Sequence, residues 1–548
     1  MLKLLRSWLT RMHRNSRTVR PLWAIFYALA FGFMVVSVLR YHQPEYGYTV
    51  LLDVGDRSLE SRDWTAERDV RVFKTLQSHG YDGQYYAQLA LDPGLSDPAL
   101  QETVDNLAYR ARRMLLPWVA HVLGLGNPGW ILNAFALLNL GCWVVLSLVL
   151  LRWFPPVSLD RAIRWFGVLF SAGMCSSMTA SLVDGPSLLF LALAVFWWEK
   201  GHRIRASLAL ALGGLTKETT ILGNAIHWPD NPRSLNDWMR TFGRVVLAVL
   251  PLGIWLIYLN LRFAEGSTFA GERNFAWPLR AVFLRASELW SELTGESESW
   301  RFLALSWATL ISIMVQTCFL LLRWQWKQPA WRLTVPFAGL ALVIGSANWD
   351  GYPGSVGRSL LPLLLGFNLL VPSARRWLPL LVLGNLTVFW GLSTFPPRPG
   401  SEQVVEIKNT AGAVYFGAER SFEIDFPRPW FGLESNATRD WRWSSGDAEI
   451  MILNPYASDL RVALAGRLGV SSDRQVRLLQ DSAVLWEGEV GEDPVDWQVA
   501  GVILPPGTSV LRIESDEPPT QIHDWDERML SFCLFRFEVR GETIAAGH

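Results

Sequence analysis

The feature that most constrains this chain is a series of apolar runs that recur between residues 21 and 395. The runs are about 16 to 27 residues long, and a helix needs about 20 residues to cross the hydrocarbon core of a bilayer. A helix also pairs its own backbone polar groups, which lipid cannot do. Only 18% of all residues are charged, against roughly 25% in soluble domains. The sequence therefore predicts a polytopic α-helical membrane protein and excludes a purely soluble or disordered one.

Basic residues predict how the chain is oriented in the membrane. The first apolar run, Leu22 to Leu39, follows a stretch with six Lys/Arg and no acidic residue, and no small-x-small cleavage pattern follows it. Residues 1–20 are therefore predicted to be a cytoplasmic basic N-terminus before a retained anchor. Alternate connections are also basic, which assigns residues 41–112 and 263–300 to external loops. Further spans are predicted at about 128–152, 159–180, 184–199, 243–262, 301–323, 330–347, 357–372 and 376–395.

Residues 203–228 decide on which side the C-terminus lies. One crossing here would place three later basic clusters outside, so we expect two short helices that meet at Thr216-Lys217-Glu218. A break there would also expose both charges to a wet cavity, which lowers the cost of burying them. A simple cytoplasmic end with snorkelling charges is the alternative. With the break, about eleven spans form a transmembrane domain over residues 21–400, and the protein is predicted to be a multi-pass protein of the inner (plasma) membrane.

The C-terminal part, residues 401–548, differs in both charge and pattern. It carries 13 basic and 25 acidic residues, whereas the preceding residues carry 37 basic and 25 acidic ones. Short alternating runs are separated by turn residues such as Pro505-Pro506-Gly507, which is typical of an all-β sandwich or jelly roll. We expect this domain to lie in the periplasm or outside the cell. Its acidity excludes nucleic acid as a partner.

The predicted loop between the first two spans combines a carboxylate with several cations. It contains Tyr81-Asp82-Gly83-Gln84-Tyr85-Tyr86 and, further on, Tyr109-Arg110-Ala111-Arg112-Arg113 just before an apolar helix. Arginines can bind a phosphate leaving group bidentately, and a carboxylate can deprotonate an incoming hydroxyl. External arginines also run against the positive-inside tendency, which favours a specific role. The alternative is that Asp82 caps the following helix and the arginines bind headgroups of membrane lipid.

These segments resemble the first external loop of bacterial polytopic glycosyltransferases of the GT-C superfamily. The layout is similar to that of the polyprenyl- or dolichyl-phosphate-mannose mannosyltransferases. Two further segments, residues 180–186 (Ala-Ser-Leu-Val-Asp-Gly-Pro) and 213–218 (Gly-Gly-Leu-Thr-Lys-Glu), resemble recurrent segments of the same enzymes. The resemblance covers roughly residues 20–395. The chain lacks the His-x-Asp-Glu variant of the mannosyltransferases and the Trp-Trp-Asp triplet of oligosaccharyltransferases, so neither the donor sugar nor a metal requirement is identified.

The resemblance implies an inverting transfer of a sugar, on the external face, from a polyprenyl-phosphate donor to a hydroxyl of a glycan, lipid or protein acceptor. Asp82 would be the general base. The residues that the resemblance places at the substrate are Gln84, Tyr85, Tyr86, Arg110, Arg112, Arg113, Asp184, Lys217, Glu218 and Arg358. Among these, Arg110, Arg112 or Arg113 would hold the donor phosphate, Lys217 and Arg358 are further candidates for it, and Asp184 would orient the acceptor.

Other chemistries have less support in the sequence. No segment has diagnostic metal-ligand spacing, so a divalent cation that bridges Asp82 and another carboxylate stays an open alternative and no cofactor is assigned. A flippase or transporter of lipid-linked glycans is the main competing function, and it predicts charges on several spans. A third hypothesis, that the membrane part only displays a carbohydrate-binding domain, leaves eleven spans unexplained.

Overall fold

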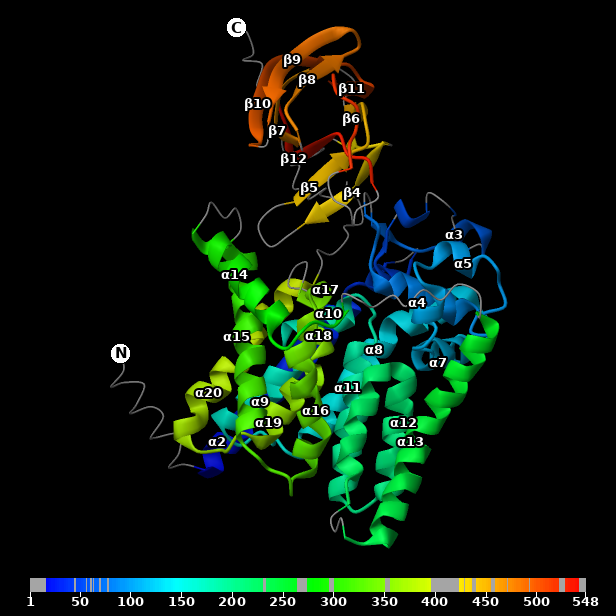
Figure 1. Ribbon diagram of the computed structural model, residues 1–548, viewed down its shortest axis with the longest axis vertical. Coiled ribbons are helices and arrows are strands. Elements are labelled where there is room, and N and C mark those ends of the chain that lie inside the picture. Colours follow the sequence, from blue (N-terminus) through cyan, green and yellow to red (C-terminus); the bar gives the residue numbers. More distant parts are fainter. Residues whose placement is uncertain are drawn as a thin grey trace.

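The computed structural model shows a bundle of apolar helices followed by a β-sandwich (Figure 1). It describes residues 16–43, 46–55, 57–59, 62, 64–68, 70–75, 78–229, 233–263, 274–294, 300–349, 355–395, 423–427, 429–435, 440–454, 459–470, 472–491, 493–521 and 528–541. The predicted basic N-terminus lies largely outside these residues.

Five helical stretches among the described residues are long and apolar enough to cross a membrane, so the prediction of a multi-pass membrane protein is confirmed. They lie in α2 (Ser16–Leu39), α8 (Pro128–Leu150), α13 (Leu235–Arg262), α15 (Trp300–Leu322) and the stretch Arg375–Thr394, which combines η5 (Arg375–Trp377), α20 (Leu378–Leu383) and η6 (Leu386–Thr394).

The other predicted spans are present as shorter or interrupted helices, and the count of eleven stays a prediction. These helices are α9 (Leu159–Leu169), α10 (Ala172–Thr179), α11 (Asp184–Glu199), α12 (Arg203–Thr216), α16 (Pro329–Val343), α18 (Val356–Ser359) and α19 (Leu361–Leu370). A short helix, α17 (Ser346–Trp349), follows α16, and α14 (Arg280–Thr294) precedes α15.

The predicted break in residues 203–228 is present in the structure. Helix α12 ends at Thr216, Lys217 is extended with φ −153°, and the 3-10 helix η3 (Glu218–His227) follows. The Lys217 N–H still donates to the carbonyl of Gly213, and the extended backbone of Lys217 then ends the helix. The side chain of Lys217 contacts Asp184, and that of Glu218 contacts Arg113. This placement brings both residues to the site described below.

The loop between α2 and α8 folds into short elements around the ten-residue, largely buried helix α4 (Asp82–Leu91). The other elements are η1 (Thr49–Leu52), β1 (Val54–Gly55), η2 (Arg57–Leu59), α3 (Trp64–Glu67), β2 (Lys74–Thr75), α5 (Leu100–Thr103), α6 (Leu107–Arg110) and α7 (Leu115–Leu123). Strands β1 and β2 pair in parallel. Apolar residues of this loop, including Tyr86 and Leu89, are buried in the same core as residues of α8, α9 and α11. The loop is therefore packed onto the bundle.

The C-terminal domain is an antiparallel β-sandwich, as predicted. One sheet has the order β10-β7-β12-β5-β4 and the other β3-β6-β11-β8-β9. The strands are β3 (Glu423–Asp425), β4 (Trp430–Ser435), β5 (Asp440–Ser444), β6 (Ala448–Asn454), β7 (Leu460–Val470), β8 (Arg474–Gln480), β9 (Ala483–Val490), β10 (Val495–Leu504), β11 (Gly507–Ser515) and β12 (Phe532–Gly541). Alternate residues of both sheets fill a single core, for example Ile450 and Ile452 from one and Leu464 and Phe537 from the other. Figure 1 shows the sandwich beyond the end of the bundle that carries α3, α4 and α17.

Candidate functional site

Asp82 is the first residue of α4, and its position is fixed by one glycine on each side, Gly80 and Gly83. Gly80 has φ +70°, and a Cβ there would lie 2.4 Å from the carbonyl oxygen of Asp53. A Cβ on Gly83 would lie 2.3 Å from the carbonyl oxygen of Ala180. A larger side chain at Gly83 would therefore push the start of α4 away from the segment before α11, and one at Gly80 would push it away from residues 53–55. The Tyr-Asp-Gly-Gln motif thus places Asp82 beside the N-terminus of α11.

Gln84 supports this loop through its side-chain amide. Its Oε1 accepts hydrogen bonds from Ser58 Oγ (2.7 Å) and the Gly55 backbone N–H (3.3 Å), and its Nε2 donates to the carbonyl of His79 (2.6 Å). The residue is buried. These three contacts hold Gln84 within the loop, and its predicted role in substrate binding stays a prediction.

Arg110 is held beside Asp82 by a second carboxylate. Its Nη2 donates to Asp82 Oδ1 at 2.9 Å, while its Nε and Nη2 bind the two oxygens of Asp105 at 2.9 and 2.6 Å. The guanidinium also lies 5.2 Å from the ring centroid of Tyr85 and 5.8 Å from that of Tyr86. Two-point binding to Asp105 and contact with aromatic faces fix the direction from which Arg110 approaches Asp82.

Arg113 connects the loop to the break between α12 and η3. Its Nε and Nη2 bind the two carboxylate oxygens of Glu218 at 2.9 and 2.8 Å, and its Nη1 and Nη2 donate to the hydroxyls of Tyr86 (2.7 Å) and Tyr109 (2.6 Å). The Arg113 side chain is 9% exposed. The Nε/Nη2 edge of the guanidinium, which could bind a phosphate bidentately, is thus occupied by Glu218.

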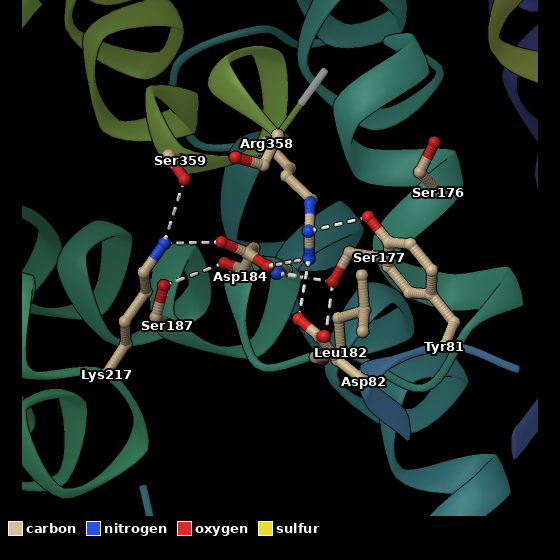
Figure 2. Close-up of polar contacts among 12 residues, drawn as sticks. Tyr81, Asp82, Ser176, Ser177, Leu182, Asp184, Ser187, Lys217, Arg358 and Ser359 are labelled. Carbon is tan, nitrogen blue, oxygen red and sulfur yellow. Dashed lines mark hydrogen bonds and ion pairs between the residues drawn. The ribbon is translucent and has the colours of Figure 1, made fainter. Parts of the chain in front are cut away.

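A second cluster of charges lies where α11, the α12 break and α18 meet (Figure 2). The Nζ of Lys217 donates to Asp184 Oδ1 at 2.5 Å and to Ser359 Oγ at 3.4 Å. Arg358 Nη1 lies 3.5 Å from Asp184 Oδ2 and 3.7 Å from Asp82 Oδ2. Arg358 Nη2 donates to the hydroxyl of Tyr81 at 2.7 Å. Arg358 therefore joins the two clusters.

The remaining predicted residues lie at the edge of this arrangement. Arg112 is half-buried, and its guanidinium lies 5.7 Å from the ring centroid of Tyr109. Tyr85 is half-buried beside Arg110, whereas Tyr86 is fully buried. Burial raises the pKa of Tyr81, Tyr85 and Tyr86 above its ordinary value, so these hydroxyls keep their protons at neutral pH. They can orient guanidinium groups but do not serve as bases.

The two carboxylates of the site, Asp82 and Asp184, are linked by a continuous series of contacts. The cations in this series are Arg110, Lys217 and Arg358. Asp82 is the more accessible carboxylate, with 25% of its side chain exposed against 4% for Asp184. Sequence reasoning missed two residues of the set. Asp105, the partner of Arg110, lies five residues before it, and Tyr81 directly precedes Asp82; these spacings were the available signals.

The geometry offers little for a metal ion. Within the ranges that the structure describes, no three His, Cys, Asp or Glu side chains gather closely enough to hold one. A divalent cation between Asp82 and Asp184 would have to displace Arg358, which now lies between these two carboxylates.

Comparisons with known proteins give little further information. No protein-family model matches the chain, and no curated protein matches it. One solved structure with a partial likeness is the single-particle cryo-EM structure of the arabinosyltransferase EmbB from Mycobacterium smegmatis, with 11% sequence identity and a TM-score of 0.22. The aligned region covers 83% of this chain and 62% of that protein. A likeness this weak carries no argument about this chain, so its function has to be inferred from its own residues.

Proposed function

We propose that this chain is a membrane glycosyltransferase of the GT-C type that transfers a sugar from a polyprenyl-phosphate donor to an acceptor hydroxyl on the external face. The observation that carries the proposal is the position of Asp82. It is a partly exposed carboxylate, oriented by Arg110 and adjacent to Arg358, which in turn neighbours the pair of Asp184 and Lys217. A base beside a cationic phosphate site is what such a transfer needs.

In the proposed reaction, Asp82 accepts the proton of the acceptor hydroxyl while that oxygen attacks the anomeric carbon of the donor sugar. The bond between this carbon and the phosphate oxygen breaks, so the configuration inverts and polyprenyl phosphate leaves. Arg358 stabilises the negative charge that develops on the leaving phosphate, and Lys217 adds positive charge beside it while it stays paired with Asp184. The proton then passes from Asp82 to water.

The other residues receive supporting roles. Arg110 and Arg113, which the sequence suggested as phosphate ligands, are already bound by Asp105 and Glu218. We therefore assign them to positioning: Arg110 orients Asp82, and Arg113 holds the loop against the α12 break. Arg112, whose guanidinium has no carboxylate partner within the described part of the chain, is the loop arginine that is left to contact a headgroup.

The proposal is tested with Asp82→Asn in purified protein supplied with polyprenyl-phosphate sugars. An amide of the same shape cannot take a proton, so turnover should fall by a factor of about 100 or more, the usual contribution of a general base. Asp97→Asn is the matched control. Asp97 lies in the same loop and pairs with Arg68 instead of a site residue, so its loss should leave turnover unchanged.

Two results would contradict the proposal. Unaltered turnover of Asp82→Asn would remove Asp82 as the base. Liposomes in which the protein moves labelled lipid across the bilayer, with no glycosidic bond formed under any donor, would favour the flippase or transporter instead. Several charges do lie within the helical part. Asp184, Lys217 and Glu218 gather at one site, whereas the buried Arg164 and Arg332 donate to the backbone carbonyls of Asn368 and Trp228.

A further inference from the structure

Arg358 holds three groups at once, and two of them are the carboxylates of the site. Its Nη1 lies 3.7 Å from Asp82 Oδ2 and 3.5 Å from Asp184 Oδ2, and its Nη2 donates to Tyr81 (Figure 2). In the proposed function the same guanidinium must bind a donor phosphate. Asp82 and the donor phosphate would therefore compete for the guanidinium of Arg358.

The two arginines that contact Asp82 are held with different strength. Arg110 makes contacts of 2.6 and 2.9 Å to Asp105 and 2.9 Å to Asp82, which are ordinary lengths for charge-assisted hydrogen bonds. The carboxylate contacts of Arg358, at 3.5 and 3.7 Å, are longer. Arg358 also extends from α18, a helix of only four residues. If one cation leaves Asp82, it is therefore Arg358.

Resting on the proposed function, we propose that Arg358 exchanges partners during the reaction cycle, binding Asp82 before the donor arrives and the donor phosphate afterwards. No covalent bond changes in this step. The exchange leaves Asp82 with Arg110 alone, so the base becomes available to the acceptor only after the donor is bound. Arg358 is then a positioning residue for Asp82 as well as a ligand of the phosphate.

The surroundings of the two carboxylates give this exchange a direction. Asp184 is 4% exposed and keeps Lys217 at 2.5 Å, so it does not need Arg358 for charge balance. Asp82 is 25% exposed and retains Arg110. A phosphate offers a guanidinium several oxygens in bidentate geometry, which neither carboxylate achieves here. Both acids therefore keep a cation when Arg358 turns to the phosphate.

The exchange makes a specific prediction for binding, measured with farnesyl phosphate as the probe and farnesol as the probe without phosphate. Asp82→Asn should tighten farnesyl phosphate binding about fivefold, because a larger fraction of Arg358 is then free to accept it. Arg358→Met should weaken binding about tenfold through loss of a charge-assisted contact. In the double variant, Asp82→Asn should have no further effect. Farnesol binding should be unchanged in all three.

The double variant separates exchange from simple repulsion between a carboxylate and a phosphate. If Asp82→Asn tightens binding equally with and without Arg358, repulsion alone acts and the exchange is wrong. If Asp82→Asn has no effect on binding, the exchange is also wrong, even where the same variant has lost turnover and so supports Asp82 as the base. Glu102→Gln controls for net charge, since Glu102 lies in the same loop and pairs with Arg62. Should Arg358→Met reduce the yield of folded protein, Arg358→Gln takes its place with the same expectations.

Discussion

At the scale of single residues, the site consists of ion pairs between parts of the chain that are far apart in sequence. Arg113 and Glu218 are separated by 105 positions, and Lys217 and Asp184 by 33. Removing one partner of such a pair leaves the other charge buried and uncompensated, which is costly. The loss of a single partner is therefore expected to destabilise the fold as well as to affect function.

The pair of Arg113 and Glu218 allows a direct test of this contribution. Arg113→Met should lower the free energy of unfolding by about 3 to 5 kcal/mol, because the carboxylate of Glu218 is left in a largely buried position without its partner. The double variant Arg113→Met/Glu218→Gln should lose less. Thermal unfolding in detergent, followed by intrinsic fluorescence, provides the measurement.

Arg62→Met is the control, since it removes contacts to Glu67 and Glu102 at a more exposed position, where ion pairs contribute little, and so should lower the unfolding temperature much less than Arg113→Met. If the single Arg113 variant and the double variant unfold at the same temperature as the unchanged protein, the pair does not stabilise the fold.

A second prediction at this scale concerns pH. Burial raises the pKa of Asp53, a residue of the loop that accepts a hydrogen bond from Thr75. In the unfolded chain Asp53 loses its proton at a lower pH than in the folded protein. Its contribution to stability is therefore full below its unfolded pKa and is lost as pH rises towards the folded pKa.

Asp53→Asn should remove this dependence. Asparagine tolerates the left-handed backbone of this residue, with φ 51°, and keeps the side-chain shape. The variant should gain thermal stability relative to the unchanged protein at pH 7 and show little difference at pH 4. An equal difference at both pH values would contradict this account.

Sequence reasoning found most of these residues but not their partners. Asp82, Asp184, Lys217 and Arg358 were all singled out as site residues, and the structure brings them together. Arg110 and Arg113 were predicted to bind phosphate because arginine binds phosphate bidentately and because arginines in an external loop run against the positive-inside tendency. Their acids, Asp105 and Glu218, balance them only after folding, and a linear pattern does not show which distant charges meet.

At the scale of elements, α14 presents an apolar face that the described part of the chain leaves exposed. Trp277, just before the helix, is 80% exposed, and Phe283 and Trp290 are 69% and 62% exposed. The opposite side of the helix, with Ala281 and Leu289, is buried in the second core of the bundle. The candidate span Leu303–Leu322 follows shortly after. We therefore expect α14 to lie along the external lipid interface, where tryptophan is favoured.

This position is measurable with an environment-sensitive dye attached through Phe283→Cys in a Cys318→Ser background, since Cys318 is exposed. The emission should shift to shorter wavelength when the protein is moved from detergent-free amphipol into lipid nanodiscs, because the dye enters the bilayer interface. The same dye at Ser482→Cys, in the exposed turn between β8 and β9, should not shift. If the emission of the dye at residue 283 also does not shift, α14 lies in water and not at the lipid interface.

The alternation of apolar and polar residues predicts most strands of the C-terminal domain. Seven strands of the sandwich, from β6 to β12, follow alternating apolar runs that the sequence displays clearly. The alternating runs did not reveal β3 to β5. In β5 the buried face carries the polar residues Arg442 and Ser444, whereas Trp441 and Trp443 lie on the other face, so the usual pattern of apolar residues inside is reversed. The break after Thr216 was predicted from charge placement alone, since charged residues in mid-membrane demand an interruption.

At the scale of the whole molecule, the net charge of zero combines a basic membrane part with an acidic C-terminal part. The structure gives these two parts separate cores. Sequence composition could predict this division, because a β-sandwich and an apolar bundle need different residues. It could not predict how the loop before α8 packs onto the bundle, which depends on close approaches such as that of Gly83 to Ala180.

The wide spacing of the site residues along the chain has a consequence for biosynthesis. Asp82 emerges from the ribosome early, its contact with Arg110 follows soon after, and Glu218 reaches Arg113 only once α12 has been made. Arg358 is separated from Tyr81 by 277 positions and is the last of the set to be synthesised. The site is therefore completed only after most of the helices have entered the membrane, so a chain whose synthesis stops before α18 would be inserted but would lack the cation that joins its two carboxylates.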